Sequence, residues 1–205
     1  MRQELLTLCA LAPVLSGSTA DWAEAAVATD ASTWGYGVCA TSVAPASLIP
    51  MTQCTETRGE AVRVHGAPPA ADMGGERMVR AECVNQWAEE QEWVTVLSKA
   101  WRMPAHINVL EVIASTLGLR WVARQPRLCS KRFVFLSDSQ VAVGALSKGR
   151  SSAFPLIGIL RRFAGIALAA DIHAAFAWVG THFNPADAPS RGINPKPQSR
   201  SSGGV

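Results

Sequence analysis

The order of strand-like and helix-like segments limits the fold of this 205-residue chain more than any other feature. Two short apolar runs joined by a Gly-containing turn come first, and later apolar runs alternate with segments of helical periodicity. We predict strands at 25–32, 35–42, 92–101, 132–138 and 171–179, and helices at 108–124, 139–149, 154–170 and from 184 onward. Hairpin-like strands followed by strands that helices separate predict an α/β fold with a mixed sheet.

Residues 43–91 interrupt this order between the second and third strands. The first part is rich in Pro, Gly, Ala and Thr and has no sustained periodicity, whereas "ERMVRAECVNQWAEEQ" at 76–91 is polar enough for an exposed helix. We therefore treat 43–91 as an insertion in a domain that spans 22–192. Residues 1–21 are predicted to form a lead-in helix, and 193–205 a disordered Pro/Ser/Gly tail.

The cysteines and the N-terminus bear on the cellular compartment. The five cysteines are odd in number, scattered and never spaced as CxxC, which argues against a disulfide framework or a zinc knuckle and for a reducing compartment. The first 20 residues resemble a secretory signal peptide, but Glu4 and Pro13 interrupt that pattern. The apolar run at 5–15 is too short to span a bilayer. We expect an intracellular protein with no membrane partner, with a secreted α/β protein as the alternative.

The formal net charge of +3 hides a strong asymmetry between the two halves of the chain. Residues 1–98 carry 5 Lys/Arg and 12 Asp/Glu, a net charge of −7, whereas residues 99–205 carry 14 Lys/Arg and 4 Asp/Glu, a net charge of +10. A basic half with so few acids favours a polyanionic partner, most simply nucleic acid. A solvated basic surface without such a partner is the alternative.

Four acidic residues occupy positions where they could converge. Asp30 and Asp138 each end an apolar strand, and ligands of open α/β sheets bind at that edge. Glu111 lies near the start of the helix at 108–124, on a ridge of small residues that would let the helix approach the sheet closely. Asp187 follows the last strand in "NPAD". Four gathered carboxylates repel one another and raise each other's pKa, so we expect them to gather only around divalent cations.

Each acid also has an ordinary structural explanation, as a helix cap or a turn residue. The alternatives are a capping box of Asn108 with Glu111, a similar helix start at Asn184 with Asp187, a helix cap at Asp138, and an Asx-turn at Asp30 before Gly35.

Five short motifs together resemble a known family. "TDAS", "GYGV", "HINVLEVIA", "FLSDSQ" and "NPADAPSR", in this order, are similar to the ribonuclease H domain of retroelement reverse transcriptases, in particular those of tyrosine-recombinase (DIRS-like) retrotransposons. The resemblance covers about residues 22–192. It implies a ribonuclease H-like fold, with a central mixed five-stranded sheet flanked by helices, a long insertion between the second and third strands, and 1–21 as the connection from a polymerase region.

The resemblance also implies an activity and a site. The expected reaction is hydrolysis of the RNA strand of an RNA–DNA hybrid with two Mg²⁺ ions, or with Mn²⁺, leaving 5′-phosphate and 3′-hydroxyl ends. The implied catalytic and metal-binding acids are Asp30, Glu111, Asp138 and Asp187. Candidate contacts to nucleic acid are Ser32, Trp34, Ser139, Arg150 and His182, for which turn, cap or solvated-loop roles are the alternatives. The implied partners are the hybrid and a polymerase domain in the parent polyprotein; a catalytically inactive nucleic-acid-binding relic is the competing function.

Overall fold

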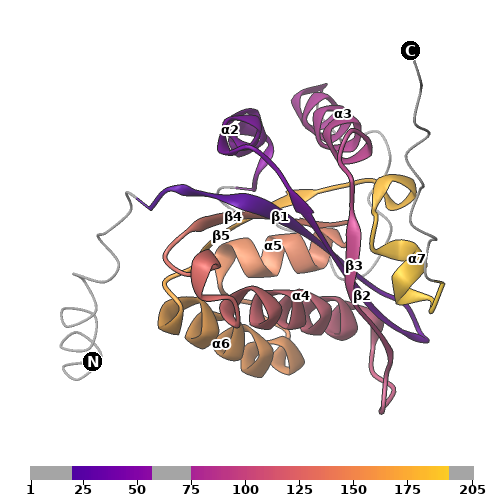
Figure 1. Cartoon of the computed structure of the whole chain (residues 1–205). Helices are drawn as coiled ribbons and strands as arrows, with labels where there is room; N and C mark the ends of the chain where they lie inside the picture. Colours follow the sequence, from indigo (N-terminus) through magenta and orange to yellow (C-terminus); the bar gives the residue numbers. More distant parts are fainter. Residues whose placement is uncertain (1–19, 57–74, 194–205) are drawn as a thin grey trace.

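The computed structural model describes residues 20–56 and 75–193, and for 75–78 the backbone only. A five-stranded mixed sheet lies between two layers of helices (Figure 1). The strands are β1 Trp22–Ala31, β2 Gly35–Ser42, β3 Val94–Ala100, β4 Arg132–Ser137 and β5 His173–Trp178. The helices are α2 Pro45–Cys54, α3 Gly75–Glu89, α4 Ile107–Ala123, α5 Gln140–Lys148, α6 Phe154–Ala169 and α7 Asp187–Ser190, with 3-10 turns at Pro126–Leu128 and Thr181–Phe183. The prediction of an α/β fold with a mixed five-stranded sheet is confirmed.

The strand order is β3-β2-β1-β4-β5. The first three strands form an antiparallel meander, and β4 and β5 extend it in parallel with β1. The parallel register pairs Ala28 with Leu136. Because Asp30 and Asp138 each lie two residues beyond that pair, the two acids reach the same edge of the sheet.

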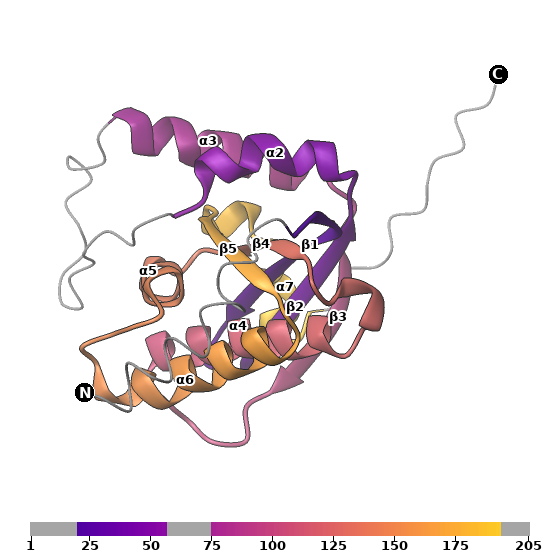
Figure 2. The same ribbon diagram turned by 90° about the vertical axis from the view of Figure 1, so that its left-hand side faces the viewer.

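Helices cover both faces of the sheet (Figure 2), and a hydrophobic core cluster lies under each layer. On one face α4, α5 and α6 pack over the aromatic side chains of Phe133, Phe135 and Phe176. On the other face Leu48 of α2 and Val84 of α3 belong to the second core cluster. Since alternate side chains of a strand point to opposite faces, the interior strand β4 is apolar and buried at all four positions from Phe133 to Leu136.

Helix α4 lies unusually close to β1, because small residues form its inner ridge. The hydroxyl groups of Thr29 and Ser115 are hydrogen-bonded at 3.0 Å. A Cβ atom added at Gly118 would lie 2.9 Å from the Cγ2 atom of Thr29. The close approach expected from the ridge Glu111–Ser115–Gly118 is therefore present, and it carries Glu111 to the end of β1.

The structure corrects the description of the insertion. Helix α2 was not predicted, because Pro45 and Pro50 both look like loop residues; the helix nevertheless buries Leu48 and Met51, which lie three residues apart. Helix α3 was predicted as exposed, yet Val84, Trp87 and Ala88 are buried against the sheet side. Because the Trp87 side chain belongs to the second core cluster, α3 is part of that core layer.

Some predictions lie outside the described residues. These are nearly all of the lead-in helix at 1–21, the tail at 193–205 and the middle of the insertion at 57–74. Among the helices of the described ranges, none combines the length and the apolar character needed to cross a bilayer.

Candidate metal centre

Three of the four predicted acids meet at the edge of the sheet. Asp30, Glu111 and Asp138 each offer a carboxylate oxygen, and these atoms all lie within 4.8 Å of one another. Asp30 comes from the end of β1, Asp138 follows β4, and Glu111 is the fifth residue of α4. We call these three residues the acidic triad. Asp30 and Glu111 lie more than 80 residues apart along the chain, and Glu111 and Asp138 more than 20, so only the fold brings them together.

The acidic triad is largely withdrawn from water. Asp30 and Glu111 are 3% and 6% exposed. The backbone N–H of Ala31 hydrogen-bonds the Glu111 carboxyl group, but the buried Oε2 atom of Glu111 has no hydrogen-bond partner among the described residues. A buried acceptor left without a partner costs about 1–3 kcal/mol, and more when it is charged. A cation bound beside this atom would satisfy it.

Burial and mutual repulsion raise the pKa values of two members of the triad. The pKa of Asp30 is raised to about 8, first by burial and then by the charge of Asp138. The pKa of Glu111 is raised to about 9 by burial and by the charges of Asp30 and Asp138. Without a cation between them, both groups hold a proton at neutral pH. A divalent cation would reverse this preference, because it stabilises the ionised carboxylates.

None of the three acids acts as the cap or turn residue that was the alternative explanation. Helix α4 is capped by His106, whose Nδ1 accepts from the Asn108 N–H, so Asn108 is not the N-cap. Helix α5 is capped by Ser139, whose hydroxyl accepts from the N–H of Ala142. In the β1–β2 turn the acceptor is the hydroxyl of Ser32, which receives the N–H groups of Trp34 and Gly35. The triad carboxylates are thus left available for a ligand.

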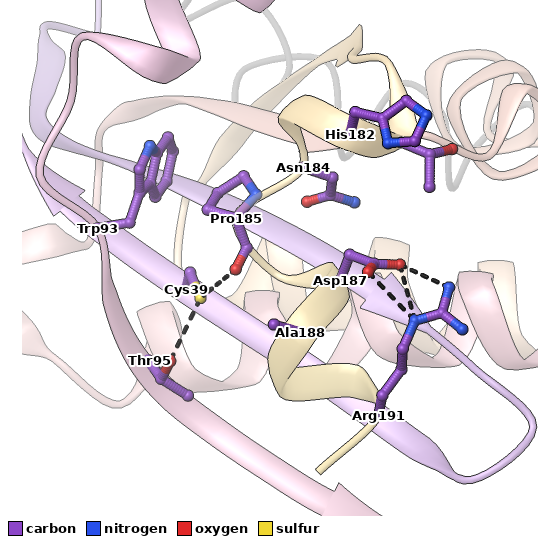
Figure 3. Close-up of a pocket in the computed structure, with 10 residues that line it drawn as sticks. Cys39, Trp93, Thr95, His182, Asn184, Pro185, Asp187, Ala188 and Arg191 are labelled. Carbon is purple, nitrogen blue, oxygen red and sulfur yellow. Dashed lines mark hydrogen bonds and ion pairs between the residues drawn. The ribbon is translucent and has the colours of Figure 1, made fainter. Parts of the chain in front are cut away.

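Asp187 lies outside the acidic triad. It is the first residue of α7, and its carboxylate is held by Arg191 at 2.8 Å from Nη2 (Figure 3). The expected helix start at Asn184 is wrong, since Ala186 is the N-cap of α7. Asp187 still lies close enough for its charge to raise the pKa of Asp30.

Asn184 is a site residue that the sequence analysis did not assign to the site. Its Nδ2 atom lies 3.3 Å from Asp138 Oδ1 and 3.5 Å from Asp30 Oδ1, and donates to the Thr29 carbonyl at 3.2 Å. Its Oδ1 atom accepts from the Ala186 N–H at 3.1 Å. The amide therefore ties two triad carboxylates to the segment that carries Asp187. The only signal was its place in "NPAD", which is equally typical of a helix cap.

The candidate nucleic-acid contacts fall into two groups. The hydroxyls of Ser32 and Ser139 are already used by the backbone, Ser32 also donating to the Ser190 carbonyl at 2.7 Å. Trp34 is 46% exposed and its ring lies over Gly192. Arg150 and His182 are exposed, His182 in the 3-10 turn Thr181–Phe183. Arg150 follows the C-terminal end of α5, whereas Asp138 precedes its N-terminal end. The two serines thus have structural roles in the turn and the cap, and the other three side chains are open to solvent.

A pocket of about 480 Å³ lies beside Asn184, the residue whose amide contacts the acidic triad (Figure 3). Asn184, Asp187 and Arg191 line it, together with His182 from the preceding 3-10 turn. The other lining residues are Cys39 of β2, Trp93 and Thr95 around the start of β3, and Thr181, Pro185 and Ala188. Asn184 and Asp187 therefore connect the pocket with the triad.

The donor set of the acidic triad fits a hard divalent cation. Carboxylate oxygens are the ligands that Mg²⁺, Mn²⁺ and Ca²⁺ prefer, and the Oε2 atom of Glu111 is a buried acceptor without a partner among the described residues. The triad could therefore hold a metal ion.

No protein-family model, no curated protein and no solved structure matches this chain. The functional argument consequently rests on the triad and its surroundings.

Proposed function

We propose that this chain is a metal-dependent endonuclease of the ribonuclease H type, which hydrolyses the RNA strand of RNA–DNA hybrids. The observation that carries the proposal is the convergence of Asp30, Glu111 and Asp138 from three separate elements into one buried cluster. Structural carboxylates rarely gather in this way, because repulsion and burial both oppose it. Functional sites do, since a cation and substrate offset that cost.

The fold is consistent with this proposal. A meander of three antiparallel strands, continued by two parallel strands and covered by helices, is the arrangement that the ribonuclease H resemblance implies. The insertion supplies α2 and α3, which cover the second face of the sheet. The proposal includes a retroelement reverse transcriptase as the origin of the domain, with a polymerase domain as partner and an intracellular location.

The residues have distinct roles under this proposal. Asp30, Glu111 and Asp138 would hold divalent cations, with Asp187 at the rim. Bound Mg²⁺ or Mn²⁺ supplies an activated water and stabilises the charge that develops on the phosphate oxygens. Asn184 orients the carboxylates of Asp30 and Asp138 through its amide. The buried surroundings of the triad strengthen these electrostatic interactions.

The substrate preference is proposed from charge and shape. The basic half of the chain would attract the phosphate backbones of the hybrid, because several of its arginine side chains are exposed to solvent. Examples are Arg120, Arg124, Arg127, Arg150 and Arg161. Backbone contacts carry no sequence information, so we expect recognition of the hybrid by its shape and by the 2′-hydroxyl groups.

The test is cleavage of a hybrid whose RNA strand is labelled, in Mg²⁺ and in EDTA. We expect cleavage by the wild-type protein only with Mg²⁺, and loss by at least about 100-fold in Asp138→Asn, because the metal supplies several kcal/mol of transition-state stabilisation. The matched control is Asp171→Asn. Asp171 is an acid of the same basic half with φ 51°, a conformation that Asn also tolerates.

Two outcomes would count against the proposal. Cleavage by Asp138→Asn at the wild-type rate would show that the triad is not the active site. A folded wild-type protein that binds the hybrid without cleaving it in Mg²⁺ or Mn²⁺ would favour the inactive nucleic-acid-binding relic instead.

A further inference from the structure

Asp187 lies outside the acidic triad and is bonded to Arg191, and the geometry points to Arg191 as a placeholder for a divalent cation. We infer that a second cation, bound between Asp187 and the triad, displaces the guanidinium from Asp187. This inference rests on the proposed function, since it requires that the triad binds the first cation.

The ion pair has the geometry of a specific but replaceable contact. Arg191 Nη2 lies 2.8 Å from Asp187 Oδ1, and Arg191 Nε lies 3.1 Å from both carboxylate oxygens. The Arg191 side chain is 55% exposed and that of Asp187 is 29% exposed. Exposed ion pairs contribute little to stability, so exchanging this one for a metal bond is energetically accessible.

The Arg191 guanidinium also lies in the electrostatic field of the triad. The pKa of Arg191 is raised mainly by Asp187, and further by the charges of Asp30 and Asp138. In turn, the charge of Asp187 contributes to the raised pKa of Asp30. Arg191 is therefore a positive charge that feels both Asp187 and two members of the acidic triad, where a second cation would bind.

The backbone of α7 is held in place, so the exchange would be made by the side chains of Asp187 and Arg191. The Ser32 hydroxyl donates to the Ser190 carbonyl and the Ser98 hydroxyl donates to the Pro189 carbonyl, both at 2.7 Å. Gly37 packs so closely against the α7 backbone that an added Cβ would collide with it. The pocket of about 480 Å³, which both Asp187 and Arg191 line, leaves room for the displaced guanidinium (Figure 3).

The test is calorimetric titration of the full chain with Mn²⁺. For wild type we expect two binding events, the weaker one lost in Asp187→Asn. In Arg191→Gln we expect the weaker event to tighten at least about threefold, because the competing ion pair is gone, while the tighter event changes less, since Arg191 acts on the triad only through its charge. The charge-matched control, Arg161→Gln on the exposed face of α6, is expected to change neither event.

A double-mutant cycle separates competition from a general charge effect. If Arg191 acts through Asp187, then Arg191→Gln added to Asp187→Asn does not produce the threefold tightening in the remaining event. A second readout is the Arg191 Nε–H signal in NMR spectra, which should shift along the weaker Mg²⁺ binding curve only.

The outcomes distinguish this inference from the proposed function. It is overturned if wild type binds one cation only, if Arg191→Gln leaves the weaker event unchanged or weakens it, or if the tightening persists in the Asp187→Asn background. In each of those cases cleavage that depends on Mg²⁺ and Asp138 would leave the proposed function standing. If no cation binds to wild type, both are overturned.

Discussion

At the scale of single residues, Asn184 is the side chain whose role is least apparent from the sequence. It is 5% exposed, and its amide lies within 3.5 Å of two triad carboxylates. An amide in that place keeps the two carboxylates in position for a shared cation, as outer-shell partners do in metal sites.

We therefore expect Asn184→Ala to weaken Mn²⁺ binding at the triad by about 10- to 100-fold, the range found for outer-shell partners. Isothermal calorimetry measures this directly. Asn85→Ala is a suitable control, because Asn85 also accepts from a backbone N–H near the site, that of Gly180, yet does not touch the triad. Unchanged Mn²⁺ affinity in Asn184→Ala would show that the amide does not position the carboxylates.

At the scale of elements, the closeness of α4 and β1 decides where Glu111 lies. The contact depends on Gly118, where an added Cβ would lie 2.9 Å from Thr29 and 3.4 Å from the Cγ1 atom of Val27. The helix is thus held at a distance that only a residue without a side chain permits.

Gly118→Ala should lower the free energy of unfolding by about 1–2 kcal/mol, because overpacking costs about 1–3 kcal/mol and outweighs the gain of about 1 kcal/mol in helix propensity. It should also weaken cation binding by displacing Glu111. The control is Gly158→Ala on α6, where an added Cβ meets nothing within 4 Å, so that this variant should be stabilised by about 0.5–1 kcal/mol. Urea unfolding of the two variants would contradict the argument if both changed in the same direction.

At the scale of the whole molecule, the buried triad links stability to pH and to metal. The folded-state pKa values of about 8 for Asp30 and about 9 for Glu111 lie above the unfolded values of 3.8 and 4.5. At pH values between the unfolded and the folded pKa of each group, the folded protein keeps a proton that the unfolded chain releases. The free energy of unfolding therefore decreases as pH rises from about 5 to about 9 in EDTA.

Saturating Mg²⁺ should oppose this loss, because it binds the ionised carboxylates of the folded state only. Calorimetric Tm values at pH 5, 7 and 9, with EDTA or Mg²⁺, measure both effects. Asp138→Asn should show a shallower decrease in EDTA, since the charge of Asp138 helps to raise both pKa values. A Tm in EDTA that rises steadily from pH 5 to pH 9 would contradict the proposed protonation of the triad.

The sequence by itself determined the positions of all five strands and of the helices at 108–124, 139–149 and 154–170, because period-2 and period-3.6 apolar patterns are local properties. It also indicated Asp30 and Asp138 together, since parallel strands present their ends at one edge. Only the tertiary structure decided that one face of α3 is buried and that His106, Ser32 and Ser139 provide the caps and the turn. It alone decided that Asp187 pairs with Arg191 while Asn184 joins the triad. These outcomes depend on which side chains meet across the fold, and no local pattern in the chain encodes that.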